Sequence, residues 1–358
     1  MNKNRLIQRN SNALNMKDRG PNLSARNQML SLLGAQALAV HAIAIAADLG
    51  IADLLDAQPQ TAEELAAKTG ANPDALGRML HALNSIGVFE QDVKGRHRNT
   101  ELSATLRRDI PGSLSGWARY MTSNVVNRTF EGLSYSVMTG QPVFPKLFEK
   151  TLFEYLAGDH AMGEIFAGGM SSYSSSSVCE AVEVYDFSQA KRIADIGGGH
   201  GLFLLGILSA TVSSRGILFD LPEVIVQAAA PEPPVLGHRY STMGGDFFKS
   251  VPDRCDLYIL RHVIHDWADE EAIRILENCR NAMSPGGKVV IIELLLKAPN
   301  QPAFAPFMDL TMLTLLRGRE RTVSEYREIL TAAKLRLTRV VPTNGLHTLI
   351  EAEAVCPA

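Results

Sequence analysis

The sequence is poor in cysteine, in aromatic residues and in charge of a single sign. Its 358 residues hold four cysteines and 6% aromatic residues, and 35 Lys and Arg nearly balance 38 Asp and Glu, for a net charge of −3. The cysteines form no CxxC pair and have no zinc-finger spacing, which argues against a disulfide framework and a cysteine zinc site. The small net charge gives no general attraction to nucleic acid or to an anionic membrane. We therefore expect a protein of the reducing cytoplasm that binds neither.

Long hydrophobic runs are also scarce. The most apolar stretch, residues 35–47, is interrupted by His41 and ends at Asp48. It is too short to span a bilayer, so we expect a buried helix there. Residues 1–22 are polar and mixed in charge and lack the apolar core of a signal peptide, so a flexible N-terminus is expected.

The length of the chain predicts two domains. Residues 23–112 have the pattern of a winged helix: two helices, beginning near Thr61 and Pro73, are followed by two short strands around the turn Lys94-Gly95. A winged helix can bind DNA, but the second helix offers no basic face. We therefore favour a dimerisation module over a DNA-binding one, since a fold alone does not establish a function.

The rest of the chain divides into a helical linker and an α/β domain. Residues 113–184 remain helical and are richer in aromatic residues and Met, so we expect them to contribute to a substrate pocket. Over residues 185–358 strands alternate with helices, which predicts a mostly parallel sheet covered by helices. The last two strands flank Asn344-Gly345, a dipeptide that favours an antiparallel hairpin.

A glycine-rich turn between a strand and a helix indicates a nucleotide site. Gly197 and Gly199 follow a predicted strand that ends at Asp195, and Asp220 lies 25 positions after that aspartate, at the end of the next strand. A carboxylate there can accept hydrogen bonds from ribose hydroxyls. The dinucleotide fingerprint needs a third glycine where this chain has Leu202. Asp195 would repel a pyrophosphate but suits the cationic S-adenosylmethionine, which we favour over NAD.

Asp246 and Phe247 add to this site. They follow two glycines and could face the adenine, the carboxylate accepting from its amino group. Local alternatives exist, because Asp246 could instead form an Asx-turn and Asp220 could simply precede a proline turn. The three acids nevertheless come in order at strand ends, where doubly wound sheets bind their ligands.

His265 is the candidate general base. It follows a strand end beside the predicted cofactor, and imidazole suits proton abstraction near neutral pH. Glu293, in an otherwise apolar strand, and Glu320, before an amphipathic helix, are the two carboxylates that could orient it. A satisfied core histidine is the alternative for His265, and a surface salt bridge is the alternative for Glu320. His262 lacks the same register and is expected to pack.

Taken together, these motifs resemble the plant caffeic-acid-type O-methyltransferases and their bacterial relatives that methylate antibiotic and pigment precursors. The resemblance covers residues 25–353. The stretches that carry it are Asp195-Ile196-Gly197-Gly198-Gly199-His200-Gly201, Phe219-Asp220-Leu221-Pro222, Gly245-Asp246-Phe247-Phe248, His265-Asp266-Trp267, Ser284-Pro285-Gly286-Gly287 and Arg319-Glu320-Arg321-Thr322.

The resemblance implies a Rossmann-like methyltransferase domain with a seven-stranded sheet, preceded by a winged-helix domain that forms a homodimer. It implies His265 as base, oriented by Glu293 and Glu320, without a metal. It also implies two sets of binding residues. The cofactor set is Gly197, Gly199, Asp220, Leu221, Asp246, Phe247, Arg261 near the adenine, and Ser174 near the methionine end. The acceptor set is Phe166, Met170, Met312 and Asp266, although the apolar members could equally be core residues.

Three departures from the family pattern concern the acceptor site: Arg317-Gly318 replaces Gly-Gly, Ala333-Lys334-Leu335 replaces Ala-Gly-Phe, and the segment from Asp309 to Glu320 is one residue shorter. The expected acceptor is an aromatic or polyketide-like hydroxyl. A nitrogen acceptor, a reaction without methyl transfer (hydroxylation or pericyclic rearrangement) and a cofactor-sensing regulator remain the alternatives.

Overall fold

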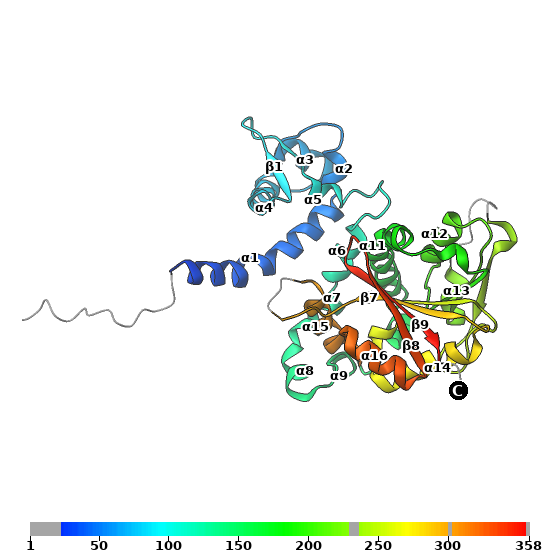
Figure 1. Cartoon of the computed structure of the whole chain (residues 1–358). Helices are drawn as coiled ribbons and strands as arrows, with labels where there is room; N and C mark the ends of the chain where they lie inside the picture. Colours follow the sequence, from blue (N-terminus) through cyan, green and yellow to red (C-terminus); the bar gives the residue numbers. More distant parts are fainter. Residues whose placement is uncertain (1–22, 229–235, 300–302, 356–358) are drawn as a thin grey trace, which may run out of the picture.

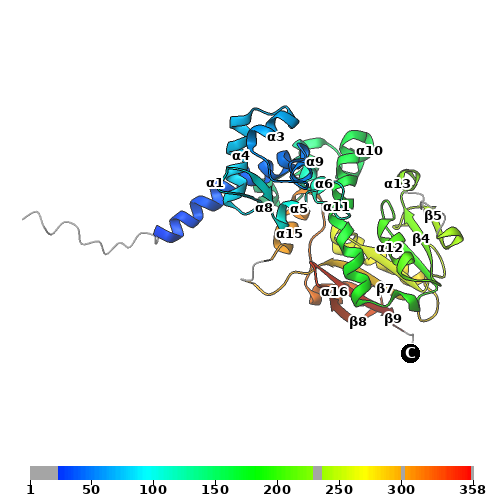
Figure 2. The same ribbon diagram turned by 90° about the horizontal axis from the view of Figure 1, so that it is seen from above.

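The structure is a computed structural model that describes residues 23–228, 236–299 and 303–355. The expected flexible N-terminus, residues 1–22, lies outside the described residues. The remaining chain forms a helical N-terminal part and a sheet domain with helices on both faces (Figure 1, Figure 2).

The first helix, α1 (Leu23–Asp48), extends away from the rest of the chain (Figure 1). Its large apolar side chains are exposed, with Leu33 at 70% and Leu38 at 72%. The expectation of a buried helix over residues 35–47 is therefore wrong for a single chain, because only the end of α1 packs, around Ala46. By length and composition Ser24–Asp48 could cross a bilayer, yet one such helix near the N-terminus does little to indicate a membrane span.

A winged-helix unit follows α1. Thr61 caps α3 with a reciprocal capping box, and Asn72 caps α4, whose first residue is Pro73. Leu76, Leu80 and other apolar residues of these helices form the core of this unit. Its elements are α2 (Ile51–Leu54), α3 (Ala62–Thr69), α4 (Pro73–Ser85), β1 (Phe89–Gln91), β2 (His97–Asn99) and α5 (Glu101–Ala104).

Six helices connect this unit to the sheet. The longest, α11, packs against α6 at two glycines, since a Cβ at Gly116 would lie 2.6 Å from the Gly168 carbonyl oxygen and one at Gly169 would lie 2.7 Å from Tyr120 Cβ. The helices are α6 (Ser115–Met121), α7 (Asn124–Glu131), α8 (Leu133–Thr139), α9 (Phe144–Phe148), α10 (Leu152–Gly158) and α11 (His160–Val184).

The sheet has seven strands in the order β5-β4-β3-β6-β7-β9-β8. Strands β3 to β7 pair in parallel, and β9 runs antiparallel to both β7 and β8. The expected doubly wound sheet with an antiparallel C-terminal hairpin is thereby confirmed. The strands are β3 (Arg192–Ile196), β4 (Arg215–Asp220), β5 (Tyr240–Gly244), β6 (Leu257–Arg261), β7 (Lys288–Leu294), β8 (Leu335–Pro342) and β9 (His347–Ala354).

Apolar residues on each face of the sheet pack against a different pair of helices. One face meets α14 and α16, and the other meets α11 and α12. The chain order reverses between β3 and β6, which makes the carboxyl ends of these strands the ligand-binding edge. The helices of this domain are α12 (Leu202–Ala210), α13 (Pro222–Gln227), α14 (Asp269–Ala282), α15 (Ala305–Leu315) and α16 (Val323–Ala332).

Candidate active site

The glycine-rich turn lies between β3 and α12. Gly197, Gly199 and Gly201 have φ values of +66°, +58° and +78°, a backbone region that residues with a Cβ rarely adopt. A Cβ at Gly197 would also meet Val263 at 2.8 Å, whereas the space beside Gly199 is open to a ligand. The Gly199 N–H donates to Asp220 Oδ2 at 2.8 Å, so the turn and the end of β4 support each other.

Asp195 presents a buried carboxylate to this turn. It is 1% exposed, and within the described part of the chain neither of its oxygens has a hydrogen-bond partner. Burial raises its pKa to about 6, although the charge of Arg261 opposes the shift. Because a buried carboxylate without partners is costly, this position suits a cationic or N–H donor ligand. The two acceptor oxygens of Asp195 thus fit the ammonium group of S-adenosylmethionine.

Arg261 lies beside Asp195, and its predicted contact with the adenine stays a prediction. Its Nη1 is 3.5 Å from Ser177 Oγ of α11, and its guanidinium lies over the Phe203 ring of α12. Successive residues of a strand alternate between faces, so Arg261 shares the α11–α12 face with Leu257 and Ile259. Burial lowers its pKa, and the Asp195 charge opposes this.

Phe247 lies on the other face, where its ring centroid is 4.9 Å from that of Phe248 and 5.9 Å from that of Trp267. Asp246 Oδ1 accepts from the Phe248 N–H at 2.9 Å, which is the local turn considered as its alternative. Asp220 Oδ1 accepts from the Leu221 N–H at 2.7 Å. These residues line the carboxyl ends of β4 and β5, as expected. The side chain of Ser174 lies outside the described residues.

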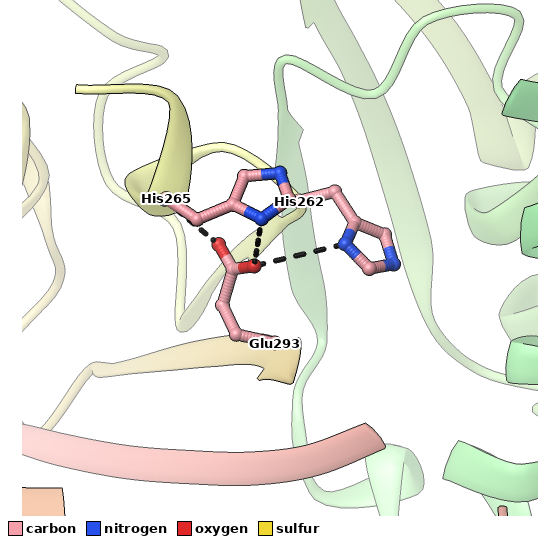
Figure 3. Close-up of side chains that lie close together, drawn as sticks. All are labelled: His262, His265 and Glu293. Carbon is pink, nitrogen blue, oxygen red and sulfur yellow. Dashed lines mark hydrogen bonds and ion pairs between the residues drawn. The ribbon is translucent and has the colours of Figure 1, made fainter. Parts of the chain in front are cut away.

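His265 and both candidate carboxylates come together at the end of β6, and Figure 3 shows His265 with one of them, Glu293. His265 is 6% exposed, and its Nδ1 lies 2.9 Å from Glu320 Oε1 and 3.3 Å from Glu293 Oε2. Its Nε2 lies 3.4 Å from Asp266 Oδ1. The ring is therefore held at Nδ1 by carboxylates, which leaves Nε2 as the nitrogen that can take a proton.

The acids around His265 and its burial shift the pKa of His265 in opposite directions. Burial alone lowers the pKa of His265, but the carboxylates of Glu293, Glu320 and Asp266 outweigh it and raise the pKa to about 10. Burial raises the pKa of Glu293 and that of Asp266 above their ordinary values. The site thus holds more acids than a single imidazolium can neutralise.

Arg321, to which the sequence analysis gave no role, fixes this arrangement. Its fully buried guanidinium donates to the carbonyl oxygens of Ile264 and Trp267 at 3.0 and 2.8 Å, on either side of His265. It also pairs with Asp269 at 2.7 Å. Its place next to Glu320 in the sequence is the signal that could have found it, since the same short segment carries the histidine's partner.

The apolar acceptor candidates lie in two clusters that share Trp117. Phe166 and Met170 pack with Tyr120, while Met312 packs with residues of α15. Tyr173, one turn after Met170, stacks on Trp117 with a centroid distance of 4.8 Å and lies 5.1 Å from the His262 ring. Its buried hydroxyl has no hydrogen-bond partner among residues 23–228, 236–299 and 303–355. Sequence spacing alone did not indicate this tyrosine.

His262, expected only to pack, joins the catalytic group. The ligand atoms of His262, His265 and Glu293 lie within 4.8 Å of one another, a spacing that could also hold a metal ion. The expectation of a site that works without a metal therefore stays a prediction.

Comparison with known proteins identifies the fold family. A family model described as an O-methyltransferase domain matches residues 130–336, which is more than half of the chain. The chain belongs to the O-methyltransferase family. An O-methyltransferase dimerisation domain matches residues 33–109 of this methyltransferase. That match supports a homodimer.

Relatives of this O-methyltransferase have nearly the same length. Phenazine O-methyltransferase PhzM of Lysobacter antibioticus is 40% identical over 313 residues, covering 87% of this chain and 91% of the relative. The 8-amino-8-demethylriboflavin N,N-dimethyltransferase of Streptomyces davaonensis is 31% identical, covering 85% and 89%. The crystal structure of CalO1, a calicheamicin biosynthesis methyltransferase in its SAH-bound form, has a TM-score of 0.85 at 30% identity, covering 94% of this chain and 100% of that one.

These findings establish an S-adenosylmethionine-dependent O-methyltransferase of the type found in antibiotic and secondary-metabolite biosynthesis.

Proposed function

We propose that this enzyme methylates a hydroxyl of a planar aromatic or polyketide-like molecule, with His265 as general base. The contact that carries the proposal is the 2.9 Å pair between His265 Nδ1 and Glu320 Oε1 at the carboxyl end of β6. A carboxylate on Nδ1 keeps a proton there and directs the bare Nε2 outward, as in other histidine–carboxylate pairs. The pair lies at the strand edge that also holds the glycine-rich turn.

His265 Nε2 takes the proton of the acceptor hydroxyl, and the resulting imidazolium is held at Nδ1 by Glu320, with Glu293 beside it. S-adenosylmethionine, when bound, supplies an electrophilic methyl group on a sulfonium, and this chemistry needs no metal. The acids around His265, against its burial, raise its pKa above the ordinary value. A raised pKa stabilises the imidazolium that forms when the acceptor hydroxyl loses its proton.

The cofactor would be held from both faces of the sheet. Asp220 and Leu221 face the ribose, and Asp246 and Phe247 face the adenine. The methionine end meets Asp195, with Gly197, Gly199 and Ser174 around it. Arg261 belongs to this end in our proposal, because its guanidinium lies beside Asp195 and on the face opposite Phe247.

The acceptor would lie against Phe166, Met170 and Met312, with Asp266 beside His265 Nε2. The apolar and aromatic character of these clusters suits a planar ring system. The relative from Lysobacter acts on a phenazine, by its name, and phenazines are planar. An amino acceptor is the second candidate, because one relative of 31% identity is an N,N-dimethyltransferase.

We further propose that residues 23–112 form the dimerisation domain, residues 113–184 a helical linker at the acceptor site, and residues 185–358 the cofactor-binding domain. Cytoplasmic location is part of the same proposal.

A product assay tests the function. The dimer is incubated with methyl-labelled S-adenosylmethionine and a panel of phenols, hydroxyphenazines, polyketides and aryl amines, and the products are analysed by mass spectrometry. Label on an acceptor oxygen with equal release of S-adenosylhomocysteine is the expected result. Label on nitrogen alone would favour the amino acceptor, and an acceptor altered without gain of a methyl group would favour the non-methylating alternative.

The exposed face of α1 gives a further prediction. Leu33→Glu combined with Leu38→Glu is expected to convert the dimer to a monomer, because both side chains are more than two thirds exposed in the single chain and the interface would bury charge. Light scattering after size exclusion measures the change. Val93→Glu with Val212→Glu is the matched control, since both valines are exposed elsewhere and the pair should stay dimeric. A dimer with both α1 substitutions would contradict the prediction.

A further inference from the structure

Three hydrogen-bonded side chains, the Glu180–His347–His262 chain, lie behind the pair of His265 and Glu320. His262 Nε2 is 3.0 Å from His347 Nε2, and His347 Nδ1 is 3.1 Å from Glu180 Oε2. The three residues come from the segment after β6, from β9 and from α11. His347 is 3% exposed, while the Glu180 side chain is 18% exposed and reaches toward solvent. The chain therefore joins the catalytic centre to the surface side of α11.

The hydrogen bonds fix which nitrogens carry protons. Glu180 can only accept when ionised, so His347 Nδ1 donates to it. A neutral His347 then has a bare Nε2, which must accept, and His262 Nε2 is its donor. Neutral His262 consequently has a bare Nδ1. Both rings are neutral. Burial lowers the pKa of His347, and burial together with nearby positive groups lowers the pKa of His262 well below its ordinary value.

The bare nitrogen of His262 faces Glu293 (Figure 3). Glu293 Oε1 accepts two backbone hydrogen bonds, from Val263 N–H at 3.1 Å and from His265 N–H at 3.3 Å. Glu293 Oε2 and His262 Nδ1 are both buried, and in the described part of the chain neither makes a hydrogen bond, although Glu293 Oε2 also has an ion-pair contact of 3.3 Å with His265 Nδ1. They lie 3.7 Å apart. Two lone pairs facing each other in a buried site are unfavourable, and one proton between them satisfies both.

We propose that the Glu180–His347–His262 chain holds a proton on Glu293 Oε2, so that Glu320 alone is the ionised partner of His265 Nδ1. The assignment matches a neutral carboxylic acid, whose carbonyl oxygen accepts two N–H groups while its hydroxyl donates to His262. The separation of 3.7 Å exceeds hydrogen-bond range by roughly half an ångström, which a small side-chain shift closes. His262, His347 and Glu180 are thus positioning residues, and the inference rests on His265 being the base.

The surroundings of Glu293 favour the neutral form. The side chain is 0% exposed, and burial is the largest cause of its raised pKa. Two acids and five other titratable or charged groups surround it. The titratable and charged groups that face it are His262, His265, Asp266, Arg261, Glu320, Tyr173 and Tyr326.

A proton on Glu293 has a catalytic consequence. It removes one of the negative charges that raise the pKa of His265, so the base form becomes available at lower pH. Loss of that proton would restore the charge and move the rising part of the pH–rate profile to higher pH.

Isotope-edited infrared difference spectroscopy of the full-length dimer, without acceptor, tests the assignment. The spectrum of the native protein minus that of Glu293→Gln is expected to show the carbonyl band of a protonated acid at neutral pH. His262→Asn keeps an acceptor near the Nδ1 position and suits the backbone there, where φ is +54°, so its band should persist. His262→Ala removes the acceptor and admits water. Glu293 should then lose its proton, and the spectrum its acid band, at a pH at least about one unit lower than in the native protein. That shift is a tenfold loss of proton affinity.

A second variant leaves residue 262 in place. His347→Ala frees the other tautomer of His262, which then donates to an ionised Glu293. The band should be lost at neutral pH, and turnover should fall at neutral pH but recover at higher pH, whereas misfolding would lower turnover at every pH.

Three results would overturn the assignment. They are the absence of a Glu293-dependent band in the native protein, the same titration in every variant, and a stoichiometric transition metal at these atoms in elemental analysis. None of them depends on methyl transfer. If His265→Ala kept full turnover while the band was present, the proposed base would fail and the protonated Glu293 would stand.

Discussion

His265→Ala is expected to lower turnover by about two decades or more while changing the affinity for S-adenosylmethionine little, because general base catalysis contributes roughly 10²- to 10⁴-fold. The Nδ1 of this ring contacts the buried carboxyl groups of Glu320 and Glu293, and its Nε2 lies beside Asp266. Single-turnover rates and calorimetric cofactor binding measure the two effects separately.

His160→Ala is the matched control, since this exposed histidine begins α11 and should leave both quantities unchanged. Normal turnover in His265→Ala would remove the residue from the mechanism. In the native enzyme turnover should rise with pH, because the carboxylates, against burial, raise the pKa of His265 to about 10 and the unprotonated base is gained as pH increases toward that value.

Asp220→Ala is expected to weaken S-adenosylmethionine binding by about 100-fold or more. An ionised acceptor contributes about 1.5–3 kcal/mol per hydrogen bond, and two ribose hydroxyls would be lost. The substitution also removes the acceptor for the Gly199 N–H, at 2.8 Å, and so loosens the turn that would surround the methionine end. Isothermal titration with S-adenosylmethionine and with S-adenosylhomocysteine gives the affinities.

Asp253→Ala is the control, because this exposed aspartate precedes the opposite, amino end of β6 and should leave binding unchanged. Equal affinity of Asp220→Ala and the native enzyme would exclude the carboxylate from the site. Asp220→Asn, which keeps one acceptor oxygen, should fall between the two.

Much of this architecture is encoded locally. The alternation of strands and helices after residue 185, the glycines after Asp195 and the Asn344-Gly345 turn specify a doubly wound sheet with a terminal hairpin. Because parallel strands share one ligand-binding edge, the positions of Asp195, Asp220 and His265 at strand ends were enough to expect them near each other.

Partner choice was not encoded locally. His265 meets Glu320 across 55 residues and His262 meets His347 across 85, and no spacing in the sequence relates them. The sequence offered both Glu293 and Glu320 as partners of His265 without saying which nitrogen they meet, and the structure places both against Nδ1, with Glu293 also accepting from backbone N–H groups.

Arg261 and α1 are two further features whose packing partners the local sequence pattern did not determine. The face on which Arg261 lies depends on the pleat register of β6 against α11 and α12, which places its guanidinium beside Asp195. The apolar pattern of α1 predicted a helix but could not tell which part of it packs within this chain and which part stays exposed.

The sequence by itself therefore determined the fold class, the cofactor and the kind of chemistry, since these depend on short motifs at strand ends. Only the tertiary structure decided which carboxyl group faces which nitrogen, on which face of the sheet Arg261 lies and that His262 contacts the candidate catalytic residues. The physical reason is that a motif specifies backbone geometry over a few residues, whereas proton positions and ion pairs depend on side chains that long-range packing brings within about 4 Å.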